Sequence, residues 1–290
     1  RSPEGRRSPE GRTRCRLCLS IIASLRKGGS LKILVCGAAG WTGRAVVANL
    51  LDKHDVYAFD INEGAWNAWE DIDGTLPEGV TPVYGDIADF DVVEPLVAGM
   101  EAVIHLTVRF PSFDDEELAA RDDAAFLVNL KGLWNVLESA RRHQVGRVVH
   151  MGSCYAVHPE GEFFTAEVRR PDGHLYAVLK RLQEEMCRQF HEAHRTSIVV
   201  LRPDYIVDSR LGIGRFREQL GPDIEQSSSG WVCRHDLAEA CRLAAEHPSL
   251  QFEILHTVST AGAEETCNVA RTREVLGLTF AGQLDEYRQV

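Results

Sequence analysis

The 290-residue sequence has no apolar run long enough to cross a bilayer and little of the positive charge that nucleic-acid binding needs. The apolar stretch 17–25 falls far short of the roughly 20 residues that span a membrane. The formal net charge is −11. Because residues 1–30 carry eight Arg/Lys against Glu4 and Glu10 (+6), the remainder carries −17 and repels phosphate backbones. We expect a soluble cytoplasmic protein without nucleic-acid or membrane partners.

A disulfide framework is also missing. Eight cysteines are scattered, mostly within apolar stretches typical of a core, which favours a reducing compartment. Cys15 and Cys18 form one C-x-x-C pair without the second pair that a structural zinc site needs, so we expect no metal. Residues 1–30, which repeat RSPEGR and lack an initiating Met, are expected to be a disordered leader or added sequence outside the fold.

From Leu31 onward, short β-rich runs alternate with segments of helical period. This alternation is typical of an α/β protein with a doubly wound parallel sheet of Rossmann type. The expected strands are 31–37, 56–60, 80–85, 102–106, 147–151 and 197–201. The expected helices are 41–53, a long one ending near 143, and 172–192.

Beyond Arg202 the pattern loosens. We expect loops, a helix at 235–246, a strand near 252–258 and a terminal helix at 265–276. Residues 31–290 are therefore interpreted as one domain, with the elements of a small C-terminal substrate lobe mainly after 202.

The segment GAAGWTG directly follows the first apolar strand and opens a helix. This is the context of a dinucleotide-binding turn, in which Gly37 permits the sharp turn, Gly40 lets the backbone approach a pyrophosphate, and Gly43 lets the helix pack on the sheet. The intervening residues expected beside the cofactor are Ala39, Trp41 and Thr42.

Asp60 ends the second strand, where a carboxylate can accept hydrogen bonds from both hydroxyls of an adenosine ribose. The same charge repels a 2′-phosphate and favours NAD over NADP. Arg44 could reach such a phosphate, although a first-turn arginine is more often simply exposed. Asp86, after the third strand, could bind the adenine amine while Ile87 packs on the ring, or it could cap the next helix.

Tyr176 and Lys180 are four residues apart on an expected helix, so they project from one face. An ammonium beside a phenol favours the phenolate, which can then serve as a general base. Ser153 follows the fifth strand, at the edge of the sheet where ligands bind, and can meet Tyr176 across a substrate hydroxyl. The three residues indicate hydride transfer.

This ordered series resembles the extended short-chain dehydrogenases/reductases, also called the NAD-dependent epimerase/dehydratase family. The resemblance runs from about Leu31 to Gly277. It rests on GAAGWTG, Asp60, GDIAD, VIHL at 103–106, NLKGLWNVLESARR, the serine after the fifth strand, YxxxK and LRP. It implies that Ser153 and Tyr176 handle the reacting hydroxyl, that Lys180 also holds the nicotinamide ribose, that Asn129 supports the site from its helix, and that Leu106 lies beside the cofactor.

Within the family, ARRHQVGRVVHMGS and RPDGHLYAVLK resemble segments of uronate dehydrogenases. The leading hypothesis is therefore oxidation of a sugar or sugar acid at C1 to a lactone. A carboxylate substrate needs a cationic clamp, for which arginine offers two parallel hydrogen bonds. The candidates are Arg210 and Arg215 in the loop after the sixth strand, with Arg109 as a third.

Two other functions remain open: a nucleotide-sugar epimerase or dehydratase, and a non-catalytic NAD-binding regulator. The lobe after Leu201 is small for enclosing a nucleoside diphosphate, and a regulator has no need of all three catalytic residues.

The resemblance also suggests a homodimer joined through the helices that contain 130–137 and 176–192. Burial of those apolar positions against the chain's own sheet is the competing explanation.

Overall fold

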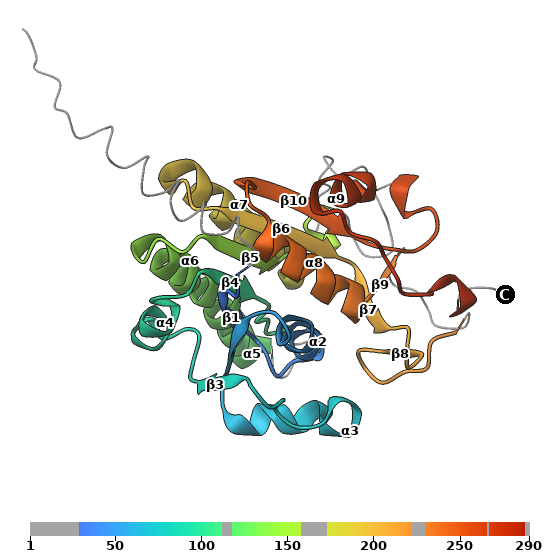
Figure 1. The fold of residues 1–290 in the computed structure, drawn as a ribbon, viewed down its shortest axis with the longest axis horizontal. Helices are drawn as coiled ribbons and strands as arrows, with labels where there is room; N and C mark the ends of the chain where they lie inside the picture. Colours follow the sequence, from blue (N-terminus) through green and yellow to red (C-terminus); the bar gives the residue numbers. More distant parts are fainter. Residues whose placement is uncertain (1–28, 112–117, 158–172, 222–229, 266, 288–290) are drawn as a thin grey trace, which may run out of the picture.

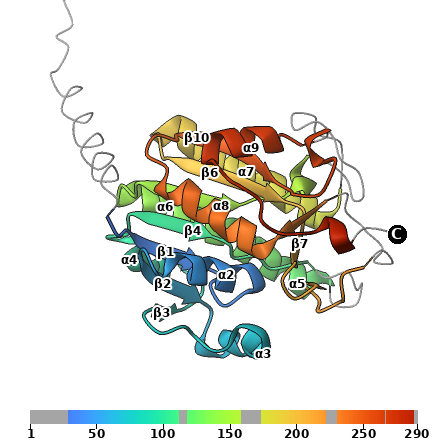
Figure 2. The same ribbon diagram turned by 45° about the vertical axis from the view of Figure 1, so that its right-hand side comes forward.

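A computed structural model describes residues 29–111, 118–157, 173–221, 230–265 and 267–287. One seven-stranded sheet lies between two layers of helices (Figures 1 and 2). The strand order is β10-β6-β5-β4-β1-β2-β3, and every neighbouring pair is parallel. The strands are β1 (Lys32–Cys36), β2 (Asp55–Asp60), β3 (Thr81–Tyr84), β4 (Ala102–His105), β5 (Arg147–Met151), β6 (Ile198–Pro203) and β10 (Phe252–Thr257).

The central strands are buried on both faces, as expected for parallel strands covered by helices. Adjacent residues face opposite layers, so Val148 and Val149 belong to two separate apolar clusters. One face is covered by α2 (Trp41–Leu50) and α8 (Arg234–Glu246). The other is covered by α4 (Phe90–Val97), α6 (Gly132–Arg142) and α7 (Leu175–His194). The doubly wound Rossmann fold is confirmed.

The order of the strands fixes where a ligand binds. β1 lies between β2 and β4, so the connections leaving β1 and β4 diverge at their carboxyl ends. Ligands of open α/β sheets bind in the crevice that opens at such a switch point. Gly37 follows β1 and Leu106 follows β4, and the backbone N–H of Leu106 donates to the carbonyl of Cys36 (2.9 Å).

The segment after Arg202 divides between two structures. Its helix α8 and strand β10 complete the main sheet and its cover, whereas β7 (Tyr205–Asp208), β8 (Ile213–Gly214) and β9 (Trp231–Cys233) form a second, three-stranded sheet. The sequence did not predict this sheet, because strands of two to four residues are too short to show a period of two. The second sheet places the residues around β8 near the carboxyl edge of the main sheet.

The remaining elements are short. They are η2 (Glu63–Trp69), α3 (Glu70–Asp73), α5 (Leu118–Phe126), η4 (Leu127–Lys131), η5 (Cys154–Ala156), η6 (Ala263–Glu265), α9 (Val269–Leu276) and η7 (Asp285–Tyr287). The element η4 is a π-helical turn inside what the sequence predicts to be one continuous helix. None of the described helices is both long and apolar enough to span a membrane. Residues 1–28, with Cys15 and Cys18, lie outside the described residues.

Candidate active site

The glycine turn after β1 has the geometry that a bound pyrophosphate needs. Gly37 has φ = +79°, and a Cβ there would lie 2.9 Å from the backbone nitrogen of Thr107. A Cβ on Gly43 would overlap the carbonyl oxygen of Gly37. Gly40 precedes α2 without a side-chain cap, and the first turn contains no acidic residue. The amino end of α2 therefore keeps free N–H groups and an uncompensated positive dipole for an anion.

Asp60 lies beside this turn at the end of β2. One carboxylate oxygen accepts from the backbone N–H of Ala39 (2.9 Å) and the other from that of Ile61 (2.8 Å). These bonds fix the carboxylate at the edge of the turn, where an adenosine ribose would lie, and each oxygen retains a further lone pair for a hydroxyl. The placement fits the assignment of Asp60 to the ribose.

Arg44 is buried, so the expectation of an exposed arginine is wrong. Its Nε donates to the carbonyl of Ala39 (3.0 Å), its Nη1 to that of Gly74 (2.6 Å), and its Nη2 to that of Trp66. The guanidinium also lies over the Trp66 ring, 4.8 Å from its centroid. Because Arg44 donates to three carbonyls, we do not expect it to meet a 2′-phosphate, and the selection of the cofactor by Asp60 stays a prediction.

Two expected adenine contacts lie outside the lining of the catalytic pocket. The exposed Asp86 uses one carboxylate oxygen to accept from the N–H of Ala88 (2.8 Å), and Ile87 is buried beneath α6. The helix cap that the sequence left open for Asp86 is supplied by Asp89, which accepts from the N–H of Asp91. The adenine role of Asp86 and Ile87 stays a prediction.

A cavity of about 270 Å³ opens at the carboxyl edge between the glycine turn and α7. The sequence predicted many of its lining residues: Gly37, Gly40, Trp41, Thr42, Gly43, Leu106, Ser153, Tyr176, Lys180 and Arg215. The lining also contains residues that were not singled out from the sequence, among them Phe110 and Asp204. The glycine turn and the Ser153–Tyr176–Lys180 set therefore line the same cavity.

Tyr176 lines this cavity and packs among aromatic rings. Its ring stacks on Phe110, with 5.2 Å between centroids, and meets Tyr155 edge-on at 5.6 Å. Burial raises the pKa of Tyr176, whereas a hydrogen bond with Ser153 and the nearby charge of Arg215 lower it. The two rings hold the phenol in place, and its polar neighbours favour the phenolate that a base requires.

Lys180 lies one helical turn further along α7. Its Nζ lies 5.7 Å from the Tyr176 ring centroid and donates to the carbonyl of Met151 (2.8 Å). Burial lowers its pKa to about 8, although the charge of Glu184 opposes the shift. Glu184 itself forms a buried two-point ion pair with Arg202 (2.7 and 2.6 Å). Among the described residues, no carboxylate therefore forms an ion pair with Lys180, and its charge lies beside the Tyr176 ring.

Ser153 and Asn129 hold the surrounding backbone. Ser153 follows β5, is buried, and accepts from the N–H of Tyr155 (3.2 Å). Asn129 lies in the π-helical turn, where its side chain accepts from the N–H of Arg109 (3.0 Å) and donates to the Arg109 carbonyl (2.7 Å). Asn129 does not line the cavity. It positions the segment whose neighbouring residue Phe110 stacks on Tyr176.

The three candidate arginines are placed differently. Arg215 lines the cavity, with its guanidinium 4.4 Å from the ring centroid of Phe110 and 4.5 Å from that of Phe216. Its Nε is buried without a hydrogen-bond partner among the described residues. Arg109 and Arg210 are exposed and do not contribute to the described lining. Only Arg215 is positioned to meet a substrate beside Tyr176.

Two buried histidines lie outside the cavity lining. His105 in β4 and His150 in β5 are paired on adjacent strands, with 3.1 Å between their Nδ1 atoms. Burial and the charge of Lys180 lower the pKa of His105 to about 3, and burial also lowers that of His150. Both rings are neutral parts of the core.

The fold, the glycine turn and the Ser153–Tyr176–Lys180 set together are what a nucleotide-dependent enzyme of Rossmann type requires, and the role of Tyr176 as the base stays a prediction. Residues 33–207 match the model of the NAD dependent epimerase/dehydratase family. The chain belongs to this family, the extended short-chain dehydrogenases/reductases, and is an enzyme that uses NAD.

Curated relatives include both dehydrogenases and dehydratases. The chain is 26% identical over 266 residues to L-arabinose 1-dehydrogenase (NAD(P)(+)) of Haloferax volcanii (85% of this chain, 94% of that protein). It is 26% identical over 235 residues to uronate dehydrogenase of Pseudomonas syringae pv. tomato (79% and 74%). A dTDP-glucose 4,6-dehydratase of Streptomyces niveus matches at 32% over 123 residues (41% and 35%).

Among solved structures, a mutated uronate dehydrogenase superposes with a TM-score of 0.66 at 22% identity, covering 89% of this chain and 84% of that chain. This likeness establishes the fold. It leaves the substrate to be argued from the site itself.

Proposed function

We propose that this enzyme oxidises a hexuronate at C1 with NAD, giving the corresponding lactone. The observation that carries the proposal is Arg215. A guanidinium lies in the catalytic cavity, and no carboxylate of the described residues forms an ion pair with it. Its buried Nε has no acceptor among the residues that the structure describes, and an unsatisfied buried donor costs about 1–3 kcal/mol. A substrate carboxylate would supply both the charge and the acceptors.

The dimensions of the site support a short substrate. Arg215 and Tyr176 both contact the ring of Phe110. The guanidinium and the phenol are therefore separated by no more than one aromatic side chain. A carboxylate held by Arg215 would orient the sugar so that another part of the same ring meets Tyr176. In a hexuronate the carboxylate and the anomeric hydroxyl lie on opposite sides of the ring oxygen, which suits this arrangement.

The residues divide the reaction between them. Tyr176, as phenolate, would accept the proton of the C1 hydroxyl while Ser153 holds that hydroxyl by a hydrogen bond. Lys180, which pairs with no carboxylate of the described residues, would stabilise the phenolate by its positive charge and would hold the nicotinamide ribose. Bound NAD supplies the acceptor for the C1 hydride. The sugar loses a proton and a hydride and becomes a lactone, and the proton passes from Tyr176 to solvent.

The proposal predicts how Arg215→Met changes substrate preference. Losing a charged hydrogen-bonding partner of the carboxylate costs about 1.5–3 kcal/mol, so kcat/KM for glucuronate or galacturonate should fall roughly 10–150-fold. Activity with glucose or galactose should change little. The measurement is NADH formation with uronates, neutral sugars and nucleotide sugars.

Arg217→Met is the matched control, since Arg217 lies two residues away but pairs with Asp71 outside the cavity lining. It should retain uronate activity. Equal losses in the Arg215 and Arg217 variants, or wild-type activity restricted to neutral sugars, would contradict a carboxylate clamp at Arg215. A nucleotide-sugar epimerase would convert its substrate without net NADH.

A further inference from the structure

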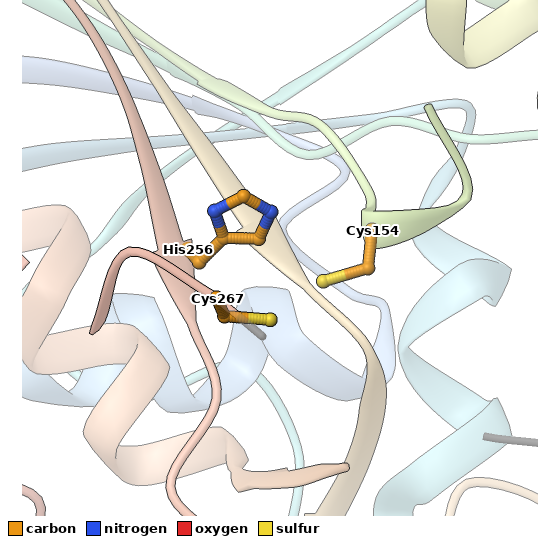
Figure 3. Close-up of side chains that lie close together, drawn as sticks. All are labelled: Cys154, His256 and Cys267. Atoms are coloured by element: carbon orange, nitrogen blue, oxygen red, sulfur yellow. The ribbon is translucent and has the colours of Figure 1, made fainter. Parts of the chain in front are cut away.

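Two thiols and an imidazole converge behind the catalytic turn. Cys154 follows Ser153 at the start of η5, His256 lies in β10, and Cys267 precedes α9. One ligand atom of each lies within 4.8 Å of the other two. Figure 3 shows the two sulfur atoms pointing toward each other beside the imidazole ring. Three segments far apart in the sequence thus bring together ligands that suit a borderline-soft metal ion.

The imidazole of His256 is held in the tautomer that can bind a metal ion through Nε2. Its Nδ1 lies 2.7 Å from Oδ1 of Asn268, and the same oxygen accepts from the backbone N–H of His256 (3.1 Å). Because this oxygen can only accept, Nδ1 carries the proton and the lone pair is on Nε2. A second hydrogen bond that fixes the ring and its tautomer is typical of metal-binding histidines.

The charge of the cluster also suits a divalent ion. The side chains are buried, with Cys154 0%, His256 1% and Cys267 6% exposed. A divalent ion bound by two thiolates and a neutral imidazole has no net charge, so the complex avoids the cost of burying an isolated ion. Binding releases two thiol protons to solvent, one of which Cys154 now donates to the carbonyl of Arg202 (3.5 Å).

We propose that Cys154, His256 and Cys267 bind one zinc ion, with water in the fourth tetrahedral position. Zinc–sulfur bonds of about 2.3 Å place two sulfurs about 3.8 Å apart, so a cluster within 4.8 Å needs only a small contraction. The ion would tie the turn that carries Ser153 to β10 and α9. No spacing in the sequence signals this site, because its ligands come from three separate segments.

The test uses the full chain, freed of metal by a chelator under reducing conditions. After incubation with Zn²⁺ and removal of the excess, about one zinc per chain should remain in the wild type. Co²⁺ alone should produce an intense thiolate-to-cobalt absorption. Cys267→Ser and His256→Gln should lose most of the bound zinc and weaken the cobalt band. Zn²⁺ should raise the thermal midpoint of the wild type by several degrees but not that of the variants.

Cys241→Ser is the matched control, because Cys241 is an equally buried thiol in α8 outside the three-residue cluster. It should bind zinc like the wild type. Circular dichroism establishes that each variant is folded. The proposal would be overturned if the wild type bound no more zinc than folded Cys267→Ser does. It would also be overturned if the cobalt complex showed no thiolate absorption. Either result leaves the proposed uronate oxidation untouched, since that depends on Arg215 and Tyr176.

Discussion

At the scale of single residues, the environment of Tyr176 decides whether it can act as a base. Burial disfavours the charged phenolate, and the charge of Asp204 adds to this effect. Ser153 and Arg215 act in the opposite direction. A substrate hydroxyl that shares the Ser153 hydrogen bond and a bound carboxylate that engages Arg215 would both alter this balance. The state of the phenol is therefore linked to the presence of the substrate.

Replacing Tyr176 with phenylalanine removes one oxygen and keeps the ring that stacks on Phe110. General acid–base groups accelerate a reaction about 10²–10⁴-fold, so kcat should fall by a factor of about 10² or more. The dissociation constant for NAD should stay nearly unchanged, because we expect the glycine turn, Asp60 and Lys180 to hold the cofactor. Steady-state kinetics and NAD titration measure the two effects separately.

Two further variants serve as references for this experiment. Ser153→Ala should reduce the rate less than Tyr176→Phe does, since it loses a positioning hydrogen bond but keeps the base. Lys180→Ala should weaken both NAD binding and the rate. If Tyr176→Phe kept more than about a tenth of the wild-type rate, the loss would be too small for a general base and Tyr176 would have to be reassigned.

The arginines show which residue-level features the sequence could predict. Arg44 has the position of a first-turn helical residue, but the carbonyls that bury it come from Gly74 and Trp66, well beyond its local segment. Arg210 and Arg215 occupy the same loop in the sequence. Only the path of β8 distinguishes them, and that strand is too short to recognise. Side-chain direction in loops depends on tertiary contacts that no local pattern encodes.

At the scale of elements, the main sheet could be predicted because its strands are apolar runs bounded by turn residues. β5 (Arg147–Met151) was predicted with its observed bounds, and the glycine turn between β1 and α2 with its position. The π-helical turn at Leu127–Lys131 was not predicted, since it adds a residue to one turn without changing composition. That turn contains the buried Asn129, whose side chain secures Arg109.

The junction of β2 with the glycine turn predicts cofactor preference. Wild-type enzyme should bind NAD more tightly than NADP, since Asp60 repels a 2′-phosphate and Arg44 is committed elsewhere. Asp60→Ala should weaken NAD binding roughly 10-fold or more and reduce the discrimination against NADP, because hydrogen bonds to a charged group contribute about 1.5–3 kcal/mol. Titration with both cofactors measures this.

Asp55→Ala provides the control, since Asp55 is exposed at the opposite end of β2. It should bind both cofactors like the wild type. Tighter binding of NADP than of NAD by the wild-type enzyme would show that a cation other than Arg44 meets the phosphate.

At the scale of the whole molecule, two helices on one face leave apolar side chains exposed. Trp134 of α6 is 46% and Leu182 of α7 is 44% exposed, whereas Leu133 and Leu137 of α6 are buried in the core. The sequence pattern groups Leu133, Trp134 and Leu137 on one face of the first helix and Leu182 with the apolar positions of the second, and it leaves open whether these form an interface or pack on the sheet. Leu133 and Leu137 pack in the core, whereas Trp134 and Leu182 stay exposed on the described surface.

A homodimer through α6 and α7 stays a prediction. Light scattering at micromolar concentration should give the mass of a dimer, and Leu182→Asp should shift it to the monomer because it places a charge in an apolar interface. Leu211→Asp, at an exposed position away from both helices, should remain dimeric. A wild-type protein that is entirely monomeric would exclude the interface.

In the proposed reaction the enzyme removes a hydride from C1 of a sugar acid and releases it in reduced cofactor. A hexuronate carrying deuterium at C1 distinguishes this reaction from the alternatives, with mass spectrometry of cofactor and sugar after turnover. Each NADH formed should contain one deuterium, and the lactone or its hydrolysis product should be free of label. Deuterium that stays in the sugar, without accumulation of NADH, would contradict C1 oxidation and indicate an epimerase or dehydratase reaction.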